Sequence, residues 1–340
     1  MSRSEGSAGR RKAGRLRTAL PLMIAFVVLL ELALRVAAPK LRDPLLWPDW
    51  EAQHKVEAMD AIEAKGRRAD VVFVGSSMVN AGFDPARATT LLGPGRFAFN
   101  AALNGADLRS TSLWTRNVVV PRLRPKLVVV GFNAGEANDG RGDLATLFTR
   151  FHEAPLGRVA TGTQGILADI DGWLVEHVYL ARYRIVLRRP VDALIGHDRA
   201  QDTSKVGPLG GLLGLTTFQR RPYTAGLSGQ LGHFENMLAN YHVGGVQFAA
   251  LQELADDLRA RDIRLVLVRM PVTEDLLPHF PNGEADRRSF DRALSAFVAK
   301  NGLTLIDAQS RVTERSAFVD PLHLSTKGMQ QLTEMVIAEL

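Results

Sequence analysis

The sequence predicts an α/β fold, in which a doubly wound, mostly parallel five-stranded sheet carries a large insertion and follows an N-terminal transmembrane helix. Two observations predict the sheet. Five short runs are apolar without alternation, as expected of strands that are buried on both faces of a parallel sheet. Segments with helical periodicity separate these runs, and such alternation is typical of doubly wound sheets. The strand candidates are residues 70–75, 96–100, 125–132, 263–271 and 303–307.

Helices are predicted on either side of the last strand candidates. The segment 245–262 repeats apolar residues along one stripe, which is typical of an amphipathic helix. The segment 285–302 has a similar stripe and closes at Gly302, a residue that commonly ends helices. The last helix is expected to follow Ser325, whose hydroxyl is a good N-cap.

The positive charge of the chain is concentrated in its N-terminal tail. The 340 residues have a formal net charge of +6, but residues 1–17 contain six basic residues and one acid. The remaining chain has 36 basic and 35 acidic residues and is therefore nearly neutral. Because a nucleic-acid groove needs clustered positive charge on the folded body, we expect no nucleic-acid partner. The absence of cysteine excludes disulfides, thiolate nucleophiles and thiolate metal ligands.

An apolar stretch of 22 residues, 18–39, follows the basic tail. As a helix it would be about 33 Å long, enough to cross about 30 Å of hydrocarbon. It contains one acid, Glu31, and Arg35 lies near its far end, where its stem can reach the interface. The basic flank predicts a single-pass anchor in the inner (cytoplasmic) membrane, with the body on the periplasmic side. A cleaved signal peptide is the alternative, because residues 36–38 resemble a cleavage site, although Arg35 and Pro39 argue against cleavage.

The rest of the chain is expected to form one domain with an insertion. Residues 40–69 are polar and helix-prone, and they read as a stalk or a first helix. Residues 70–340 form the α/β domain, which is interrupted at 135–244 between the third and fourth strand candidates. So long a stretch is no plain connection, and we expect an inserted cap over the site. Within it, the Arg-rich segment 172–194 is either a solvated helix face or a surface for anionic lipid or an acidic polymer.

Gly75, Ser76 and Ser77 end the first strand candidate. In doubly wound sheets the reactive groups lie just beyond the carboxyl ends of the strands. A glycine there allows a tight turn, and a serine at the turn is presented to solvent. Ser77 is therefore a candidate nucleophile. The alternative is that both serines merely cap the next helix.

Asp320 and His323 lie three residues apart on a loop just before the last helix. A carboxylate at this spacing can accept a hydrogen bond from one ring nitrogen of the histidine and fix its tautomer. The other nitrogen is then free to take a proton from a serine. Because this loop follows the last strand, we expect it at the same sheet edge as Ser77.

Three donors are candidates for stabilising a developing oxyanion at that edge. Asn133 ends the third strand candidate, and its side chain can offer an amide N–H. Gly105 follows the second strand and offers a backbone N–H that no side chain shields. The backbone N–H of Ser77 is the third. Losing one such donor typically costs about 3 kcal/mol of transition-state stabilisation.

The blocks "VGSS", "NAALNG", "GFN" and "DPLHLSTKG" together resemble those of the SGNH (GDSL-type) hydrolases. The resemblance covers roughly residues 70–134 and 245–340 and implies a flavodoxin-like sheet and ester chemistry. By position, it implies the same nucleophile, base, orienting carboxylate and oxyanion donors as the residue argument: Ser77, His323, Asp320, Gly105 and Asn133.

The sequence departs from the common SGNH pattern at two positions. Ser76 stands where the family usually has Asp before the nucleophile, and Ala134 stands where Asp usually follows the Asn. Neither departure touches the three candidate catalytic residues, although the support of the loops could differ. The pairing of "GSS" with an N-terminal anchor is similar to a membrane-tethered branch that handles acyl groups of the cell envelope. That branch includes the teichoic-acid D-alanylation protein and alginate O-acetylation proteins.

We therefore expect a membrane-anchored, extracytoplasmic serine acyl esterase or O-acyltransferase that acts on a cell-envelope polysaccharide or a related ester. No cofactor or metal is expected, and a membrane-bound protein that donates acyl groups is a conceivable partner. Two alternatives remain open. One is a non-catalytic envelope assembly protein, and the other is a lipase-like esterase, which an exposed apolar face within residues 172–194 would favour. Glu136 is expected to be an ordinary polar group of a loop.

Overall fold

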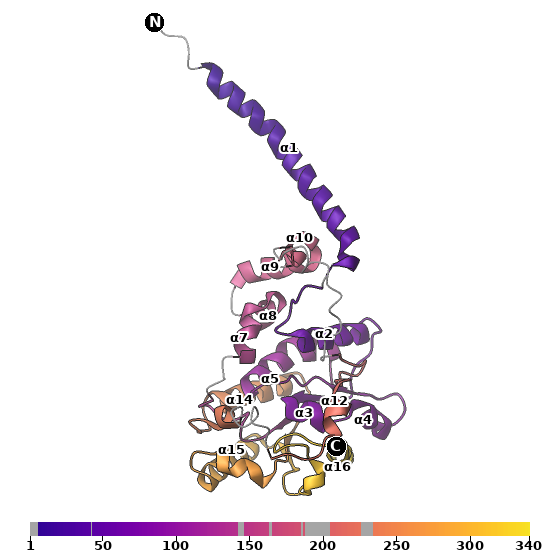
Figure 1. Cartoon of the computed structure of the whole chain (residues 1–340), viewed down its shortest axis with the longest axis vertical. Coiled ribbons are helices and arrows are strands. Elements are labelled where there is room, and N and C mark those ends of the chain that lie inside the picture. Colours follow the sequence, from indigo (N-terminus) through magenta and orange to yellow (C-terminus); the bar gives the residue numbers. More distant parts are fainter. Residues whose placement is uncertain are drawn as a thin grey trace. The chain divides into compact units, whose positions relative to one another are not determined.

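A computed structural model describes residues 6–41, 43–141, 146–162, 165–184, 186–187, 205–225 and 234–340 (Figure 1). The chain divides into two compact units. The first, which we call the helical unit, consists of residues 1–46 and 164–201. The second, the sheet unit, consists of residues 47–163 and 202–340 and contains every predicted site residue.

The sheet unit is built on a five-stranded parallel sheet with the strand order β2-β1-β3-β4-β5. Both β1 and β3 are buried at every position, as their uninterrupted apolar sequences predict. The strands are β1 (Val71–Gly75), β2 (Ala98–Asn100), β3 (Leu127–Phe132), β4 (Arg264–Arg269) and β5 (Thr304–Asp307). The predicted doubly wound α/β fold is confirmed, and the sheet is parallel throughout.

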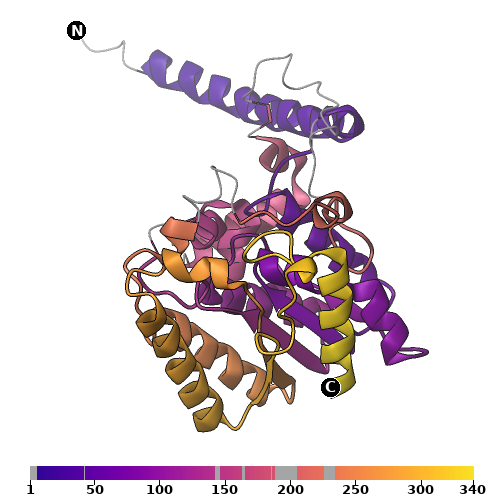
Figure 2. The ribbon, with the colours of Figure 1, turned by 60° about the horizontal axis from the view of Figure 1, so that its bottom comes forward.

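Helices pack on both faces of this sheet. On one face α14 packs against α5 and β4, whereas α16 packs against α3 and α4. Figure 2 shows α16 in yellow and α14 with α15 in orange tones on opposite sides of the strands. Among the residues that the structure describes, the helices of this unit include α2 (Trp50–Glu63), α3 (Ser77–Gly82), α4 (Pro85–Leu92), α5 (Leu108–Trp114), α6 (Val120–Leu123), α7 (Thr146–Glu153), α8 (Pro155–Thr161), α12 (Leu215–Gln219), α14 (Val246–Ala260), α15 (Glu284–Asn301) and α16 (Thr326–Glu339). The unit also contains the π-helix η2 (Thr115–Val119) and the 3₁₀ helices η4 (Glu274–His279) and η5 (Arg315–Ala317).

The predicted helix signals lie where the sequence placed them. Gly302 follows α15 in a left-handed conformation with φ of 61°. Ser325 caps α16, because its hydroxyl accepts the backbone N–H of Gly328 at 3.3 Å.

Two glycines allow the chain after β1 to pack tightly against β3. Gly75 is paired with Gly131 across the strands. Gly75 has φ of 151°, and a Cβ there would lie 2.4 Å from the carbonyl oxygen of Gly131. A Cβ on Gly131 would lie 2.6 Å from a methyl group of Val79 in α3. The missing side chains let α3, which begins with Ser77, pack directly on the ends of both strands.

Parts of the segments 40–69 and 135–244 belong to the sheet unit. The helix α2 buries Ala52, Val56 and Met59. From the long segment between β3 and β4, the elements α7, α8 and α12 belong to the sheet unit, whereas α9 (Gly165–His177) and α10 (Tyr179–Tyr183) belong to the helical unit.

The helical unit contains α1 (Gly6–Ala37) and the turn η1 (Ala38–Lys40) besides α9 and α10. Over the part of the chain that the structure describes, α1 is the one helix long and apolar enough to cross a membrane. The candidate span runs over Ala19–Lys40 and has a mean hydropathy of 2.2. A membrane anchor and a signal sequence both fit such a helix near an N-terminus.

Candidate active site

The turn after β1 gives its two serines different tasks. Ser76 is the N-cap of α3, because its Oγ accepts the backbone N–H of Met78 at 3.2 Å. Ser77 is the first residue of α3, and its Oγ is hydrogen-bonded to a histidine ring instead of to the helix backbone. Capping therefore accounts for Ser76 but not for Ser77.

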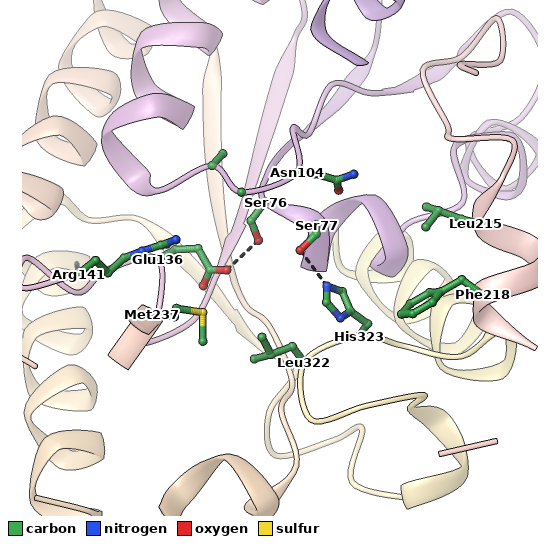
Figure 3. Close-up of a pocket in the computed structure, with 12 residues that line it drawn as sticks. Ser76, Ser77, Asn104, Glu136, Arg141, Leu215, Phe218, Met237, Leu322 and His323 are labelled. Carbon is green, nitrogen blue, oxygen red and sulfur yellow. Dashed lines mark hydrogen bonds between the residues drawn. The ribbon is translucent and has the colours of Figure 1, made fainter. Parts of the chain in front are cut away.

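Ser77, His323 and Asp320 form a continuous line of hydrogen bonds, although 246 residues separate the serine from the histidine. Figure 3 shows the bond between Ser77 and His323. The Nε2 atom of His323 lies 2.8 Å from the Oγ of Ser77. The Nδ1 atom of the same ring lies 2.8 Å from Oδ2 of Asp320 and 3.0 Å from Oδ1. With Nδ1–H donating to the carboxylate, Nε2 is the acceptor that faces the serine hydroxyl.

The surroundings of Asp320 keep its carboxylate ionised. Burial by itself raises the pKa of this carboxyl group, but four interactions outweigh it and lower the pKa below the ordinary value. These are the hydrogen bond and the charge interaction with His323, and the backbone N–H groups of Leu322 and His323, which donate to Oδ1 at 2.9 and 2.8 Å. An ionised carboxylate at this place stabilises a protonated imidazole.

A closed loop holds the histidine at the sheet edge. Phe318 and Leu324 form an antiparallel bridge, and the backbone N–H of Val319 donates to the carbonyl of His323 at 2.9 Å. The residues between them therefore form a narrow turn that ends at the cap of α16. Asp320 and His323 are thus placed by backbone pairing and not only by their mutual contact.

Ser77 and His323 open onto a cavity of about 360 Å³. Its lining combines apolar side chains with a polar end that contains a carboxylate and a guanidinium (Figure 3). The lining residues are Ser76, Ser77, Asn104, Gly105, Ala106, Glu136, Arg141, Leu215, Phe218, Met237, Leu322 and His323. Most of the lining is apolar, and a volume of this size suits a short acyl group with part of its alcohol.

Of the three predicted oxyanion donors, the structure brings two to this cavity. Gly105 lines it with φ of 78°, a conformation that favours glycine. Ser77 lines it as the first residue of α3, and first-turn N–H groups have no acceptor within their own helix.

Asn133 does not line this cavity, and the expectation that it donates there is not met. Its side-chain amide donates to the carbonyl of Met270, and its Oδ1 accepts the backbone N–H of Ala134 at 2.7 Å. The side chain thus ties the end of β3 to the end of β4. The sequence places Asn133 at the correct edge, but the direction of its side chain depends on the carbonyl groups that the neighbouring loop presents.

Glu136 has a larger role than that of a polar loop residue, and our expectation for it was wrong. It is buried, and its Oε1 accepts the hydroxyl of Ser76 at 2.7 Å. Its Oε2 accepts the backbone N–H of Asn133 at 3.0 Å. A carboxylate therefore supports the turn before the candidate nucleophile, but it comes from the loop after β3. The serine at position 76, where the related pattern has Asp, was the signal that could have indicated such a partner.

A second polar group missed by the sequence lies beneath the loop that carries Gly105. Lys55 of α2 is fully buried and donates to Oδ1 of Asn80 at 2.7 Å and to the carbonyl of Ala102. Its Nζ lies 3.5 Å from Oε1 of Glu51, which is also buried. The other oxygen of Glu51 accepts the backbone N–H of Asn104 at 3.1 Å. The pair thus holds the loop 101–106 at two points.

Burial dominates the titration of both members of this pair. It lowers the pKa of Lys55 to about 8, although the charge of Glu51 opposes the change. It raises the pKa of Glu51 in spite of the nearby ammonium group. Both shifts favour the neutral forms, so this charged pair is held at a cost in desolvation.

The segment inserted between β3 and β4 covers part of the site. Phe218 of α12 packs edge-on against the ring of His323, with ring centroids 5.6 Å apart. The next residue, Gln219, is buried and donates from Nε2 to the carbonyl of Ala81 in α3 at 2.8 Å. Figure 3 shows Phe218 beside His323 and Leu215 from the same helix nearby. These contacts shield one side of the imidazole from water.

Comparison with known proteins gives distant structural neighbours. No family model matches the sequence, and no curated protein matches it. One neighbour is described as an acylhydrolase from Bacteroides fragilis and is 13% identical in sequence. The alignment covers 86% of this chain and 98% of the neighbour, with a TM-score of 0.42. A GDSL-like lipase from Bacteroides thetaiotaomicron is 11% identical, with coverages of 84% and 98% and a TM-score of 0.39. A carbohydrate acetylesterase from Sinorhizobium meliloti is 10% identical, with coverages of 80% and 98% and a TM-score of 0.36. At these identities and TM-scores the likeness assigns no function to this chain.

Proposed function

We propose that the chain is a membrane-anchored serine enzyme of the SGNH type that cleaves or transfers acyl esters outside the cytoplasm. The observation that carries this proposal is the hydrogen-bonded line Ser77–His323–Asp320, whose serine and histidine line a cavity. A serine, an imidazole and a buried carboxylate in this order form the arrangement that activates a hydroxyl as a nucleophile.

The geometry supports a two-step acyl transfer. The Oγ atom of Ser77 attacks the ester carbonyl carbon while Nε2 of His323 takes the hydroxyl proton. The negative charge that develops on the carbonyl oxygen is stabilised by the backbone N–H groups of Ser77 and Gly105. When the C–O bond breaks, His323 returns the proton to the departing alcohol oxygen. The same imidazole then activates water or a sugar hydroxyl, which takes the acyl group from Ser77.

Asp320 does not exchange the proton in this scheme. Its carboxylate holds Nδ1–H of His323 and stabilises the imidazolium during each transfer. The apolar wall formed by Leu215, Phe218 and Leu322 excludes water beside the ring, which strengthens that electrostatic effect.

The first test compares Ser77→Ala with the exposed-serine control Ser310→Ala, using p-nitrophenyl acetate as the ester. We expect kcat/KM to fall by roughly 10³-fold or more in Ser77→Ala and to stay within about twofold in the control. A fluorophosphonate should add one adduct to the wild-type chain, at Ser77. Undiminished turnover in Ser77→Ala would reject this serine as the nucleophile. A wild-type chain that neither turns over esters nor reacts with the phosphonate would favour the non-catalytic assembly protein.

For the substrate, we propose an acylated polysaccharide of the cell envelope. Its support is the candidate span α1, because a tether at the membrane raises the local concentration of envelope polymers. The more strongly basic flank of that span is the N-terminal one, with six basic residues in 1–17, and this supports a periplasmic sheet unit. Incubation with an acetylated and a deacetylated glycan, followed by mass spectrometry, distinguishes removal of acyl groups from their transfer. Some reporters are active only in the cytoplasm. Activity of such a reporter, fused after Leu340, would contradict the proposed orientation.

A lipid ester is the second candidate substrate. The observation that favours it is a set of exposed apolar residues on α9, including Trp173. Rates on acetyl and long-chain acyl esters presented in the same vesicles would separate the two candidates. A preference for the long chain would favour the lipase-like enzyme.

A further inference from the structure

The helix α9 presents an apolar face that nothing in the described residues covers. Ile166 and Leu167 are 74% and 76% exposed, and Ile170 and Trp173 are 49% and 57% exposed. Their spacing places the four side chains on one side of the helix. Exposed single apolar residues are ordinary, but four large ones on one helix face mark a contact surface.

This face belongs to the same unit as the candidate membrane span, and polar contacts fix the turn between α9 and α10 to that span. The two carboxylate oxygens of Glu31 accept the backbone N–H groups of Tyr179 at 3.0 Å and Leu180 at 2.9 Å. Arg35, one helical turn further along α1, donates to the carbonyl of His177 at 2.9 Å. Glu31 is the one acid of the apolar stretch, and these contacts explain how it is tolerated there.

Apolar packing reinforces this attachment. Leu34 and Ala38 of the α1–η1 segment form a buried cluster with Tyr183 and Val186. Figure 1 shows α10 beside the C-terminal end of α1, where these residues lie. The hairpin made by α9 and α10 is thus bound to one end of the span by packing and hydrogen bonds together.

The position of Glu31 places this attachment within the apolar span. Glu31 precedes Lys40, the end of the candidate span, by nine residues. At about 1.5 Å per residue, the turn between α9 and α10 is held about 13 Å before that end. An element fixed at this level of a membrane-spanning helix lies within the outer half of the bilayer or its headgroup layer.

The length and composition of α9 select the interface. Its 13 residues would extend about 20 Å, too short to cross the hydrocarbon, and its exposed apolar face excludes a buried core helix. Trp173 stacks on His177 with centroids 4.8 Å apart, and the guanidinium of Arg35 lies 4.8 Å from the ring centroid of Tyr179. Tryptophan and tyrosine beside basic groups are typical of the boundary between headgroups and acyl chains.

We propose that the α9–α10 hairpin is a second membrane-contacting element, whose apolar face inserts among lipids of the non-cytoplasmic leaflet of the bilayer that α1 spans. The partner that covers this face is lipid, at the level where headgroups meet acyl chains. The proposal rests on the membrane anchoring stated under Proposed function. The hairpin then contacts both α1 and the lipid around it, so α1 is not a free tether.

The absence of native cysteine makes a direct test practical. Single cysteines replace Leu167 or Ile170 on the apolar face, and Glu176 serves as the matched exposed position on another side of α9. Each full-length variant is labelled with the environment-sensitive dye NBD and placed in phosphatidylcholine–phosphatidylglycerol vesicles. A label at Phe26 reports the span, and a label at Lys300 in α15 reports the sheet unit.

We expect labels at 167 and 170 to shift to shorter emission wavelengths and to lose at least half of their intensity when the acyl chains carry bromine. The label at 300 should remain water-like, and the label at 176, on another side of α9, should be quenched less than the labels at 167 and 170. If the label at 26 is quenched while 167 and 170 match 176, the hairpin proposal is wrong and the anchor stands. If the label at 26 is not quenched, the anchor and the hairpin proposal both fail, and the ester assay still judges Ser77 by itself. Apolar emission at 167 that needs a membrane protein extract, and is absent in pure lipid, would overturn lipid as the occupant.

Discussion

Replacing Lys55 with Met removes an ammonium group that lies at the base of the loop carrying Gly105. Met has a similar length and keeps the apolar contacts of the lysine stem. The change leaves the buried carboxylate of Glu51 without its counter-charge and leaves the carbonyl of Ala102 without its side-chain donor. The loop 101–106 keeps the bond from the N–H of Asn104 to Glu51 but loses its second attachment.

The structure sets the size of the expected effect. Breaking a fully buried pair from one side typically costs about 3–5 kcal/mol, and Lys55 is 0% exposed. The double variant Glu51→Gln with Lys55→Met carries no buried charge, and Gln keeps one of the two acceptor oxygens that face Asn80 and Asn104, so it should recover part of that loss. Because the loop carries Gly105, the proposed oxyanion donor, kcat of Lys55→Met should fall roughly 10- to 100-fold under conditions where it is folded.

The pH dependence gives an independent check of the same group. The pKa of Lys55 is lowered from 10.5 to about 8 in the folded chain, so between these values the unfolded chain binds more protons. Stability therefore rises with pH across this window, by about 3 kcal/mol for this group alone. Lys55→Met should lack that rise.

Urea unfolding of both chains at pH 7.5 and pH 10.5, followed by circular dichroism, measures these differences, and ester hydrolysis at low urea measures kcat. A free energy of unfolding of Lys55→Met within about 1 kcal/mol of the wild-type value would refute this prediction. An equal gain in stability of the wild type and Lys55→Met between the two pH values would also refute it. A double variant that is no more stable than Lys55→Met would show that the unpaired carboxylate is not the source of the loss.

Three further predictions concern the triad and the turn before it. Asp320→Asn should lower kcat by roughly 10³- to 10⁴-fold in ester hydrolysis while the protein stays folded, although less stable, at neutral pH, and a loss below tenfold contradicts its role. Since its pKa is lowered, the stability from Asp320 is present above about pH 4 and lost as pH falls through the folded value, so acid unfolding of Asp320→Asn should be shallower. Gly75→Ala should lower the free energy of unfolding in urea by about 3 kcal/mol or more, because its Cβ would clash with the backbone of β3. Gly66 has φ of 65° but open space around it, so Gly66→Ala should lower the free energy of unfolding by about 1 kcal/mol.

Local sequence patterns sufficed for the sheet and for the three residues in line. The central strands β1 and β3 are buried at every position, so their apolar runs identify them without tertiary knowledge. Ser77 and His323 could be paired because parallel strands bring their carboxyl ends to one edge, whatever lies between them in the chain. The spacing of Asp320 and His323 then fixed the third member.

The parts that were missed depend on long-range polar contacts. Charged residues on a helix are usually exposed, so no local pattern indicated that Lys55 and Glu51 of α2 are buried. Glu136 and Asn133 lie on one short loop, and which of them faces the cavity is decided by the partners Ser76 and Met270. Such choices follow from the positions of backbone groups far away in sequence.

The division of the chain into two units affects how it can be shortened. The polypeptide passes between them three times, at 46/47, 163/164 and 201/202. A truncated protein that starts at Trp47 would still carry α9 and α10. It would lack Glu31, which accepts their backbone N–H groups, and the residues of α1 that bury their apolar side chains. Such a fragment should self-associate in detergent-free buffer. Replacing 164–201 by a short glycine-serine bridge, together with the truncation, is the excision that should yield a monodisperse sheet unit for crystallisation.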